Sequence, residues 1–410
     1  MPTLAAIGLG NRGRMYLNEL RRYKDVEVTA LCDTNPINLE HTVGWAKPKQ
    51  QFSTEDDFFT AGRLADWLII GSPDLIHYRH TKRAITLGYD ILLEKPVTPN
   101  PAELDELCEL ADANGNTVLV CHVLRYTPFF RTIKDIVQRG EIGDVMNIVH
   151  EENTGYWHFA HSFVRGTWRR LDESAPYLLA KACHDFDLLH WFMDKPCENV
   201  SAYGKLTYFH SGNKPADAPP YCLDGCPRLN TCPYSVEKLY LSKKTPIGWG
   251  IPTVSELPYN PGKERTRKVL RKGQYGRCVF QCDNDVADNH SAIMRFADGS
   301  TASMSVSAFN NEFSRRIHVM GTKGELYGRD DTMHLQKRIW GSKPETLKIR
   351  EIGKSGHGGG DAGLTGTVHA LMTGQSVPRN NLTTLQETRY SHRIVYAALE
   401  SIKSGQTVQL

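Results

Sequence analysis

The first third of the chain alternates short apolar runs with amphipathic segments. Continuous apolar runs of about four to eight residues are typical of buried parallel strands. Such runs predict strands at Leu4–Leu9, Val26–Cys32, Trp67–Ile70, Asp90–Leu93 and Thr117–Val120. The segments between them predict helices at Arg14–Arg22, Asn35–Trp45, Asp74–Leu87 and Pro101–Asn114. This alternation predicts an α/β domain over residues 1–123, built on a doubly wound parallel sheet.

The pattern changes after residue 123. A helix is predicted at Tyr126–Arg139, and alternating apolar and polar positions then predict strands with one covered face. These strands are Asp144–Glu152, Asn199–Phe209, Ser291–Phe309, Arg316–Met320 and Thr332–Arg338. The covering helices are expected at Leu178–Phe192, Leu364–Met372 and Leu382–Lys403. Residues 124–410 should therefore form an α+β domain with a large, mostly antiparallel sheet, interrupted by an irregular insertion at about 211–283, where the periodicity is lost.

Composition narrows the class of partner. The chain is 40% hydrophobic and 23% charged, as expected for a globular protein, and its net charge is only +3 over 410 residues. Without a long basic run there is no electrostatic basis for binding nucleic acid or an anionic membrane. The sequence starts with no signal-peptide pattern and has no apolar stretch approaching the ~18 residues that span a bilayer. We expect a cytoplasmic protein with a small-molecule substrate.

A glycine-rich turn follows the first predicted strand. Gly8, Gly10 and Gly13, with Asn11 and Arg12 between them, would place backbone N–H groups and a helix N-terminus against a diphosphate. Asp33 closes the second strand, where its carboxylate can bind an adenine-ribose hydroxyl and would repel a 2′-phosphate. These residues predict a Rossmann domain that binds NAD rather than NADP.

Two further strand ends should face the same cofactor, because ligands of open α/β sheets bind beyond the carboxyl ends of the strands. Ser72, Pro73 and His77 follow one strand, and Glu94 and Lys95 follow the next. A buried Lys95 could exchange the proton of a hydroxyl group while a hydride leaves the same carbon. The alternative is a solvated surface lysine.

With Glu94-Lys95-Pro96 the chain resembles the Gfo/Idh/MocA family of oxidoreductases. The resemblance implies that Lys95 is the general acid and base, and that the strand end at Ser72, Pro73 and His77 contacts the nicotinamide nucleotide. It also implies a homodimer or homotetramer formed through the open face of the second sheet. Three more segments resemble family features: Trp168-Arg169, a pair near the nicotinamide; His184-Asp185-Phe186-Asp187, a His-x-x-Asp helix; and Gly321-Thr322-Lys323-Gly324-Glu325, a turn of the second domain.

One position departs from the family pattern. Many sugar and inositol dehydrogenases of the family carry an Asp four residues before the catalytic His, but here that position is Ala180, followed by Lys181. His184 shares a helix face with that position, since residues four apart are neighbours. Its orienting carboxylate would then be Asp187 or another residue. Lys95 and His184 remain the expected catalytic pair.

The second domain offers candidates for substrate binding. The segment from Tyr156 to Trp168 combines aromatic, imidazole and guanidinium groups, as polar-ligand pockets do. Its His158 and His161 could instead ligate a metal or simply pack, and His122 could enter the cleft or remain a core histidine. The expected substrate-binding residues are His122, Tyr156, His158, His161, Arg165, Lys181, Asp187 and His357.

Five cysteines lie near the two ends of the predicted insertion. Four thiolates drawn from Cys222, Cys226, Cys232, Cys278 and Cys282 could bind a structural zinc ion. Disulfides, an iron–sulfur cluster and free buried thiols are the alternatives.

These features together favour NAD-dependent hydride transfer from a secondary alcohol of a sugar, glycoside or cyclitol. The family resemblance makes the C3 hydroxyl of a sugar a plausible site of oxidation. It also leaves two alternatives: redox-neutral glycoside cleavage through a 3-keto intermediate, and a non-catalytic sensor of NAD and sugar.

Overall fold

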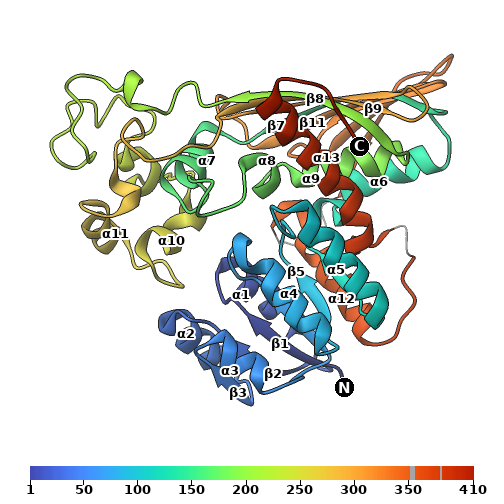
Figure 1. Ribbon diagram of the computed structural model, residues 1–410. Helices are drawn as coiled ribbons and strands as arrows, with labels where there is room; N and C mark the ends of the chain where they lie inside the picture. Colours follow the sequence, from blue (N-terminus) through green and yellow to red (C-terminus); the bar gives the residue numbers. More distant parts are fainter. Residues whose placement is uncertain (351–355, 379–380) are drawn as a thin grey trace.

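The computed structural model describes residues 1–350, 356–378 and 381–410 (Figure 1). The N-terminal domain, blue in the figure, lies beside a wide sheet formed by the later part of the chain. Among the described residues, no helix has the length and apolar character that crossing a membrane would require.

The N-terminal domain contains a six-stranded parallel sheet in the order β3-β2-β1-β4-β5-β6. Its strands are β1 (Thr3–Ile7), β2 (Glu27–Cys32), β3 (Gln50–Phe52), β4 (Trp67–Ile70), β5 (Asp90–Leu93) and β6 (Val118–Val120). Its helices are α1 (Asn11–Leu20), α2 (Pro36–Ala46), α3 (Glu55–Thr60), α4 (His77–Thr86) and α5 (Pro101–Asn114). The predicted Rossmann fold is confirmed. The sequence pattern missed β3 and α3, because β3 has three residues and exposes both of its glutamines.

The C-terminal domain is built on a nine-stranded sheet in the order β14-β13-β12-β11-β7-β10-β9-β8-β15. Its strands are β7 (Val145–Asn153), β8 (Cys197–Lys205), β9 (Asn289–Phe296), β10 (Thr301–Ser307), β11 (Ser314–Gly321), β12 (Gly324–Arg329), β13 (His334–Ile339), β14 (Glu345–Lys348) and β15 (Val408–Gln409). Only β7 and β10 pair in parallel, so the mostly antiparallel sheet is confirmed. The run predicted as one strand at Ser291–Phe309 is a hairpin, turning at Gly299 with a φ of +85°.

Helices cover one face of this sheet. They include α6 (Pro128–Gln138), α9 (Cys183–Met193) and α13 (Leu385–Ser404), and α13 also packs against α5 of the first domain. The stretch predicted as one helix at Leu178–Phe192 is split into α8 (Tyr177–Ala180) and α9. The predicted role of Leu364–Met372 was wrong: α12 (Gly360–Met372) packs on α1, where Leu364 and Val368 join the core of the nucleotide domain.

The chain between β8 and β9 is mostly irregular, with short helices such as α10 (Ile251–Ser255) and α11 (Lys263–Leu270). Its apolar residues, among them Phe209, Tyr234 and Leu270, belong to the same core cluster as the sheet. The insertion is therefore an extension of the second domain's core, and α10 reaches the first domain, where Asn11 Nδ2 donates to Thr253 Oγ1 (3.1 Å).

Candidate active site

The glycine-rich loop fits closely against the end of β4. Gly8 has a φ of +82°, and a Cβ on it would lie 2.4 Å from the backbone nitrogen of Ser72. A Cβ on Gly13 would lie 2.0 Å from the carbonyl oxygen of Gly8, whereas a Cβ on Gly10 would meet no atom within 4 Å. The loop thus leaves open space at the N-terminus of α1, which suits the diphosphate of a dinucleotide.

Asp33 lies at the end of β2, beside this loop. Its carboxylate accepts the backbone N–H of Leu9 (2.5 Å) and that of Asn35 (2.7 Å). Arg14, which the sequence pattern did not single out, donates to the carbonyl oxygen of Leu9 (2.6 Å) and to Asn38 Oδ1 (2.9 Å). Asp33 is therefore in the place where a carboxylate meets the adenine ribose of NAD.

The side chain of Arg12 is held by two carboxylates. Its Nε donates to Glu94 Oε1 (2.8 Å) and its Nη2 to Asp361 Oδ1 (2.8 Å). Burial alone would raise the pKa of Glu94, but the charges of Arg12 and Lys95 hold that pKa below its ordinary value. Arg12 thus joins the glycine-rich loop, the Glu-Lys-Pro segment and the start of α12, rather than projecting freely toward a ligand.

Lys95 extends from the end of β5 toward the second domain. Its Nζ donates to the carbonyl oxygen of Ala180 (2.5 Å), and its backbone N–H donates to Glu94 Oε2 (3.0 Å). The backbone at position 180 therefore supplies an acceptor for Lys95, although the side chain there has none. Lys95 is half-buried.

His77 connects the two strand ends that were expected to face the cofactor. Its ring nitrogens lie 2.7 Å from the carbonyl oxygen of Pro96 and 2.7 Å from that of Ser72, and its side chain is buried. Pro73 precedes Asp74, whose carboxylate contacts the second domain. His77 fixes the two segments relative to each other.

A row of four histidines, of which His184, His122 and His392 are buried, begins beside Lys95. The ring of His184 lies edge-on to that of His122 (5.6 Å between centroids), which lies edge-on to His392 (5.6 Å), and His357 is 6.5 Å from His184 on the other side. Burial and the charge of Lys95 lower the pKa of His184 well below its ordinary value. Neither ring nitrogen of His122, nor Nδ1 of His184, has a hydrogen-bond partner among the described residues.

No carboxylate of α9 reaches His184. Asp187 forms two hydrogen bonds of 2.7 Å with the buried guanidinium of Arg125. Asp185 accepts from His150 Nε2 (2.8 Å) and from Arg315 Nε (2.8 Å). Both aspartates stabilise the domain's interior, so neither contacts the imidazole of His184.

Lys181 is a second, mostly buried cation near Lys95. Its Nζ is 3.3 Å from Glu152 Oε1 and 4.9 Å from the centroid of the Phe313 ring. Burial lowers the pKa of Lys181 despite the nearby carboxylate of Glu152. Burial also raises the pKa of Glu152, against the charges of Arg315 and Lys181.

The expected substrate segment divides into two parts with different environments. His158, at the end of α7 (Tyr156–Phe159), lies between the rings of Trp249 (5.1 Å) and Phe313 (5.0 Å). Both aromatic rings are about half exposed, and burial together with the charge of Lys181 lowers the pKa of His158. Tyr156 packs edge-on to Tyr234 (5.9 Å). His158 is thus the member of this segment that lies near Lys181.

His161 and Arg165 point into the insertion. His161 Nδ1 lies 3.1 Å from the Tyr240 hydroxyl, and burial lowers the pKa of His161 to about 3. Arg165 Nε donates to the carbonyl oxygen of Arg277 (2.7 Å), and its Nη2 donates to that of Tyr234 (2.9 Å). The structure therefore gives these two side chains anchoring contacts with the insertion.

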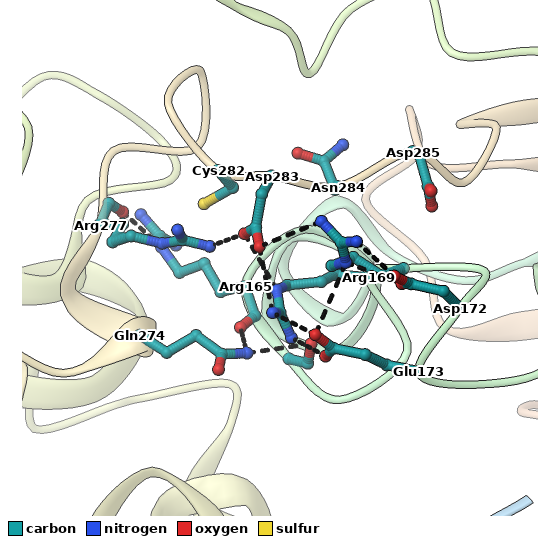
Figure 2. Close-up of polar contacts among 12 residues, drawn as sticks. Arg165, Arg169, Asp172, Glu173, Gln274, Arg277, Cys282, Asp283, Asn284 and Asp285 are labelled. Atoms are coloured by element: carbon teal, nitrogen blue, oxygen red, sulfur yellow. Dashed lines mark hydrogen bonds and ion pairs between the residues drawn. The ribbon is translucent and has the colours of Figure 1, made fainter.

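Trp168 and Arg169 lie at the domain boundary. Trp168 Nε1 donates to Asp74 Oδ2 (3.0 Å). Figure 2 shows the guanidinium of Arg169 between Asp283 (3.0 Å) and Glu173 (2.7 Å), with Arg277 also contacting Asp283. Arg169 thus ties its loop to the far end of the insertion.

The cysteines do not form a metal centre. Over the described ranges, no three His, Cys, Asp or Glu side chains converge as metal ligands would, and all ten cysteines are free. Four of them line a small cavity beside Arg165: Cys222, Cys226, Cys232 and Cys278. The structure therefore does not support the expected zinc site at these cysteines, nor the alternative of a metal held by His158 and His161, and the thiols are free.

Trp249 and Phe313 are the site residues that sequence reasoning missed. Trp249 belongs to the insertion and Phe313 precedes β11, so nothing local in the sequence places either ring beside His158. A tryptophan inside an otherwise irregular segment is a sequence signal that could have drawn attention, and the structure shows Trp249 about half exposed.

Comparison with known proteins identifies the family to which the chain belongs. The oxidoreductase family Gfo/Idh/MocA matches with its NAD-binding Rossmann fold over residues 3–122 and its C-terminal alpha/beta domain over residues 134–410. The putative oxidoreductase YteT of Bacillus subtilis is 24% identical over 391 residues, which cover 88% of this chain and 87% of that protein.

Two further comparisons involve proteins of named activity. The scyllo-inositol 2-dehydrogenase (NADP(+)) IolW of Bacillus subtilis is 33% identical over 98 residues, or 24% of this chain and 27% of that protein. The WlbA dehydrogenase of Bordetella pertussis, solved with NADH and UDP-GlcNAcA, has a TM-score of 0.70 and 18% identity, covering 100% of this chain and 97% of that one. Since the family models match both domains, this chain is an NAD-dependent oxidoreductase that belongs to the Gfo/Idh/MocA family.

Proposed function

We propose that this protein oxidises a secondary alcohol of a sugar, glycoside or cyclitol. The observation that carries the proposal is the position of Lys95, which reaches from the end of β5 to the carbonyl oxygen of Ala180 and lies beside buried histidines with unpartnered nitrogens. Buried polar groups without partners are costly, so ring nitrogens of this kind suit the hydroxyl groups of a bound ligand.

In this proposal Lys95 accepts the proton of the reacting hydroxyl group, and His184 holds that oxygen in place as a neutral imidazole. NAD, when bound, supplies the hydride acceptor at C4 of its nicotinamide. Gly8, Gly10, Asn11 and Gly13 would hold its diphosphate and Asp33 its adenine ribose. His158, with Trp249 and Phe313, would contact the apolar face of the sugar ring.

The related proteins support this substrate class. WlbA was solved with a nucleotide sugar and IolW is named for an inositol. An aldose-aldose oxidoreductase of Caulobacter crescentus also shares the fold, with a TM-score of 0.67 at 14% identity. The C3 hydroxyl of a sugar remains our proposed position of oxidation.

The test is NADH formation by the full chain with a panel of glycosides, aldoses and cyclitols. Lys95→Ala should lose at least about a hundredfold of kcat/KM, the usual contribution of a general base. Lys82→Ala, a lysine on the surface of α4, should retain full activity. Full activity of Lys95→Ala would overturn the role of this lysine. Release of an aglycone without net NADH would instead identify redox-neutral cleavage, and binding without turnover a sensor.

Two further properties follow the same proposal. Ten free thiols suit a reducing compartment, so we propose the cytoplasm as the location.

The uncovered face of the second sheet exposes Val149, Tyr203, Ile293 and Tyr327. We propose that this face joins subunits in a homodimer or homotetramer.

A further inference from the structure

A second cavity lies next to the candidate active site. It has a volume of about 350 Å³ and is walled on one side by Tyr156 and Trp157 of α7 and by Asn311. The insertion supplies the other side through Lys238, Ser242 and Lys244. With Leu239 and Pro246, its walls therefore combine apolar and aromatic side chains with two ammonium groups, one amide and the hydroxyl groups of Ser242 and Tyr156.

The charge of this cavity is uncompensated. No Asp or Glu lines it, and within the described ranges neither lysine lies within ion-pair distance of a carboxylate. Lys238 Nζ donates only to the carbonyl oxygen of Thr231 (3.2 Å), and the neighbouring Glu237 is paired with Arg267 (3.0 Å). Two unpaired ammonium groups around one cavity favour an anionic ligand.

Side chains in contact connect the cavity with Lys181 of the candidate active site. The ring of Trp157 contacts the ring of Phe313 (5.7 Å between centroids), and Phe313 lies 4.9 Å from Lys181 Nζ. Trp157 also stacks on His158, at 5.8 Å and 26°. A ligand bound against Trp157 would therefore be separated from the cleft by one or two side chains, a suitable arrangement for neighbouring units of one molecule.

We propose that this cavity binds an acidic sugar unit, which carries a carboxylate, sulfate or phosphate group and is joined to the unit oxidised at Lys95. The proposal rests on the proposed function, since it assumes that the oxidised unit belongs to a glycoside. Lys238 and Lys244 would bind the oxyanion, and Asn311 and Ser242 the hydroxyl groups. Tyr156 and Trp157 would contact the C–H face of the ring.

The kinetic test compares matched disaccharides that differ only in their second unit, which is neutral, a uronate, a 6-sulfate or a 6-phosphate. The wild type should prefer at least one acidic member by about tenfold or more in kcat/KM, as charge-assisted hydrogen bonds predict. Lys244→Gln and Lys238→Gln should remove that preference while activity on the neutral disaccharide stays unchanged. The comparison among the three acidic groups identifies which oxyanion the site takes.

The matched control is Lys243→Gln. Lys243 is exposed, adjacent in sequence and not part of the cavity wall, so this variant should behave as the wild type. Equal losses on the neutral and acidic disaccharides, or a wild type without acid preference, would overturn the subsite.

A binding measurement separates failure of the subsite from failure of the proposed function. Calorimetric titration of the Lys95→Ala protein with glucuronate, glucose 6-sulfate and glucose 6-phosphate needs no turnover. Binding of at least one of these, lost in Lys95→Ala/Lys244→Gln and retained in Lys95→Ala/Lys243→Gln, supports the subsite even if no glycoside is oxidised. Binding that does not change with Lys244→Gln contradicts it.

Discussion

Arg12 and Asp361 are joined by two hydrogen bonds, of 2.8 and 3.3 Å, although 349 residues separate them in the sequence. The same aspartate lies 3.1 Å from His357 Nδ1. The glycine-rich loop is therefore held from the C-terminal part of the chain as well as by β4.

Replacing Asp361 by Asn should weaken the binding of NAD. The carboxylate is buried, whereas Arg12 is about one-third exposed, so we expect a loss of about 1–3 kcal/mol in unfolding free energy. KM for NAD should rise more than kcat falls, because Asp361 acts through Arg12. Steady-state kinetics and urea unfolding check this expectation. The control Asp25→Asn removes an exposed partner of His369, and it should leave KM for NAD unchanged.

Introducing the family's carboxylate at position 180 should change the pH dependence of the reaction. In Ala180→Asp a negative charge would lie close to Lys95, opposing the burial and positive charge that lower the pKa of His184. The pKa of His184 should rise, and the acidic limb of the kcat/KM profile should move up by about one pH unit.

Ala180→Asn separates charge from size in this experiment. The Asn side chain resembles that of Asp in volume but is neutral. The maximum value of kcat/KM can therefore change, but the pH at which the acidic limb falls should be that of the wild type. Equal displacement of the profile in both variants would show that packing, not charge, controls His184.

His290 should contribute to the acid sensitivity of the fold. Burial lowers its pKa to about 4 in the folded protein, against about 6.5 in an unfolded chain. Between these values the unfolded chain binds more protons, so this contribution is complete above about pH 6.5 and is lost as the pH falls toward 4. For His290→Gln, unfolding free energies measured from pH 7 to 4 should fall less steeply, by up to about 1.4 kcal/mol per pH unit. His334→Gln, at an exposed position on β13, should retain the wild-type slope.

Asp283 should control how firmly the insertion is attached. It accepts hydrogen bonds from Arg169 and Arg277 (Figure 2). Its Oδ2 also lies 3.8 Å from Arg170 Nη1. Asp283→Asn should speed hydrogen exchange and proteolysis within residues 206–288, with little change in the nucleotide domain. Asp217→Asn removes a single contact with Arg228 and should have a much smaller effect. Uniform changes over the whole chain would contradict a local role.

Local sequence patterns predicted the elements whose apolar runs are long. β1, β2, β4 and β5 pair in one buried parallel sheet. In β9 the pattern predicted a strand, although the apolar Ile293 lies on its exposed face. β3 was not predicted because a three-residue edge strand needs no apolar run. The pattern predicted that α12 covers the second sheet, whereas it packs on the nucleotide domain. An apolar helix face does not indicate which of two cores it joins.

The candidate site likewise contains residues that a local motif predicts and contacts that no local motif predicts. The glycines and Asp33 act through backbone geometry close to one strand end, which a motif can encode. The contacts of Arg12 with Asp361, and of His158 with Trp249, join residues far apart in sequence, so no local pattern contains them. The contacts of Arg169 with Asp283 and Glu173 were likewise not contained in the Trp-Arg motif.

The acceptor for Lys95 has a genetic consequence. Because that acceptor is the main-chain oxygen of residue 180, no change of side chain at this codon can delete it, provided that α8 keeps its course. Residue 180 can therefore be replaced by any residue that fits the buried site, while Lys95 keeps its hydrogen bond to the main chain. Natural variation at this codon would then be a poor guide to whether a relative has kept its chemistry.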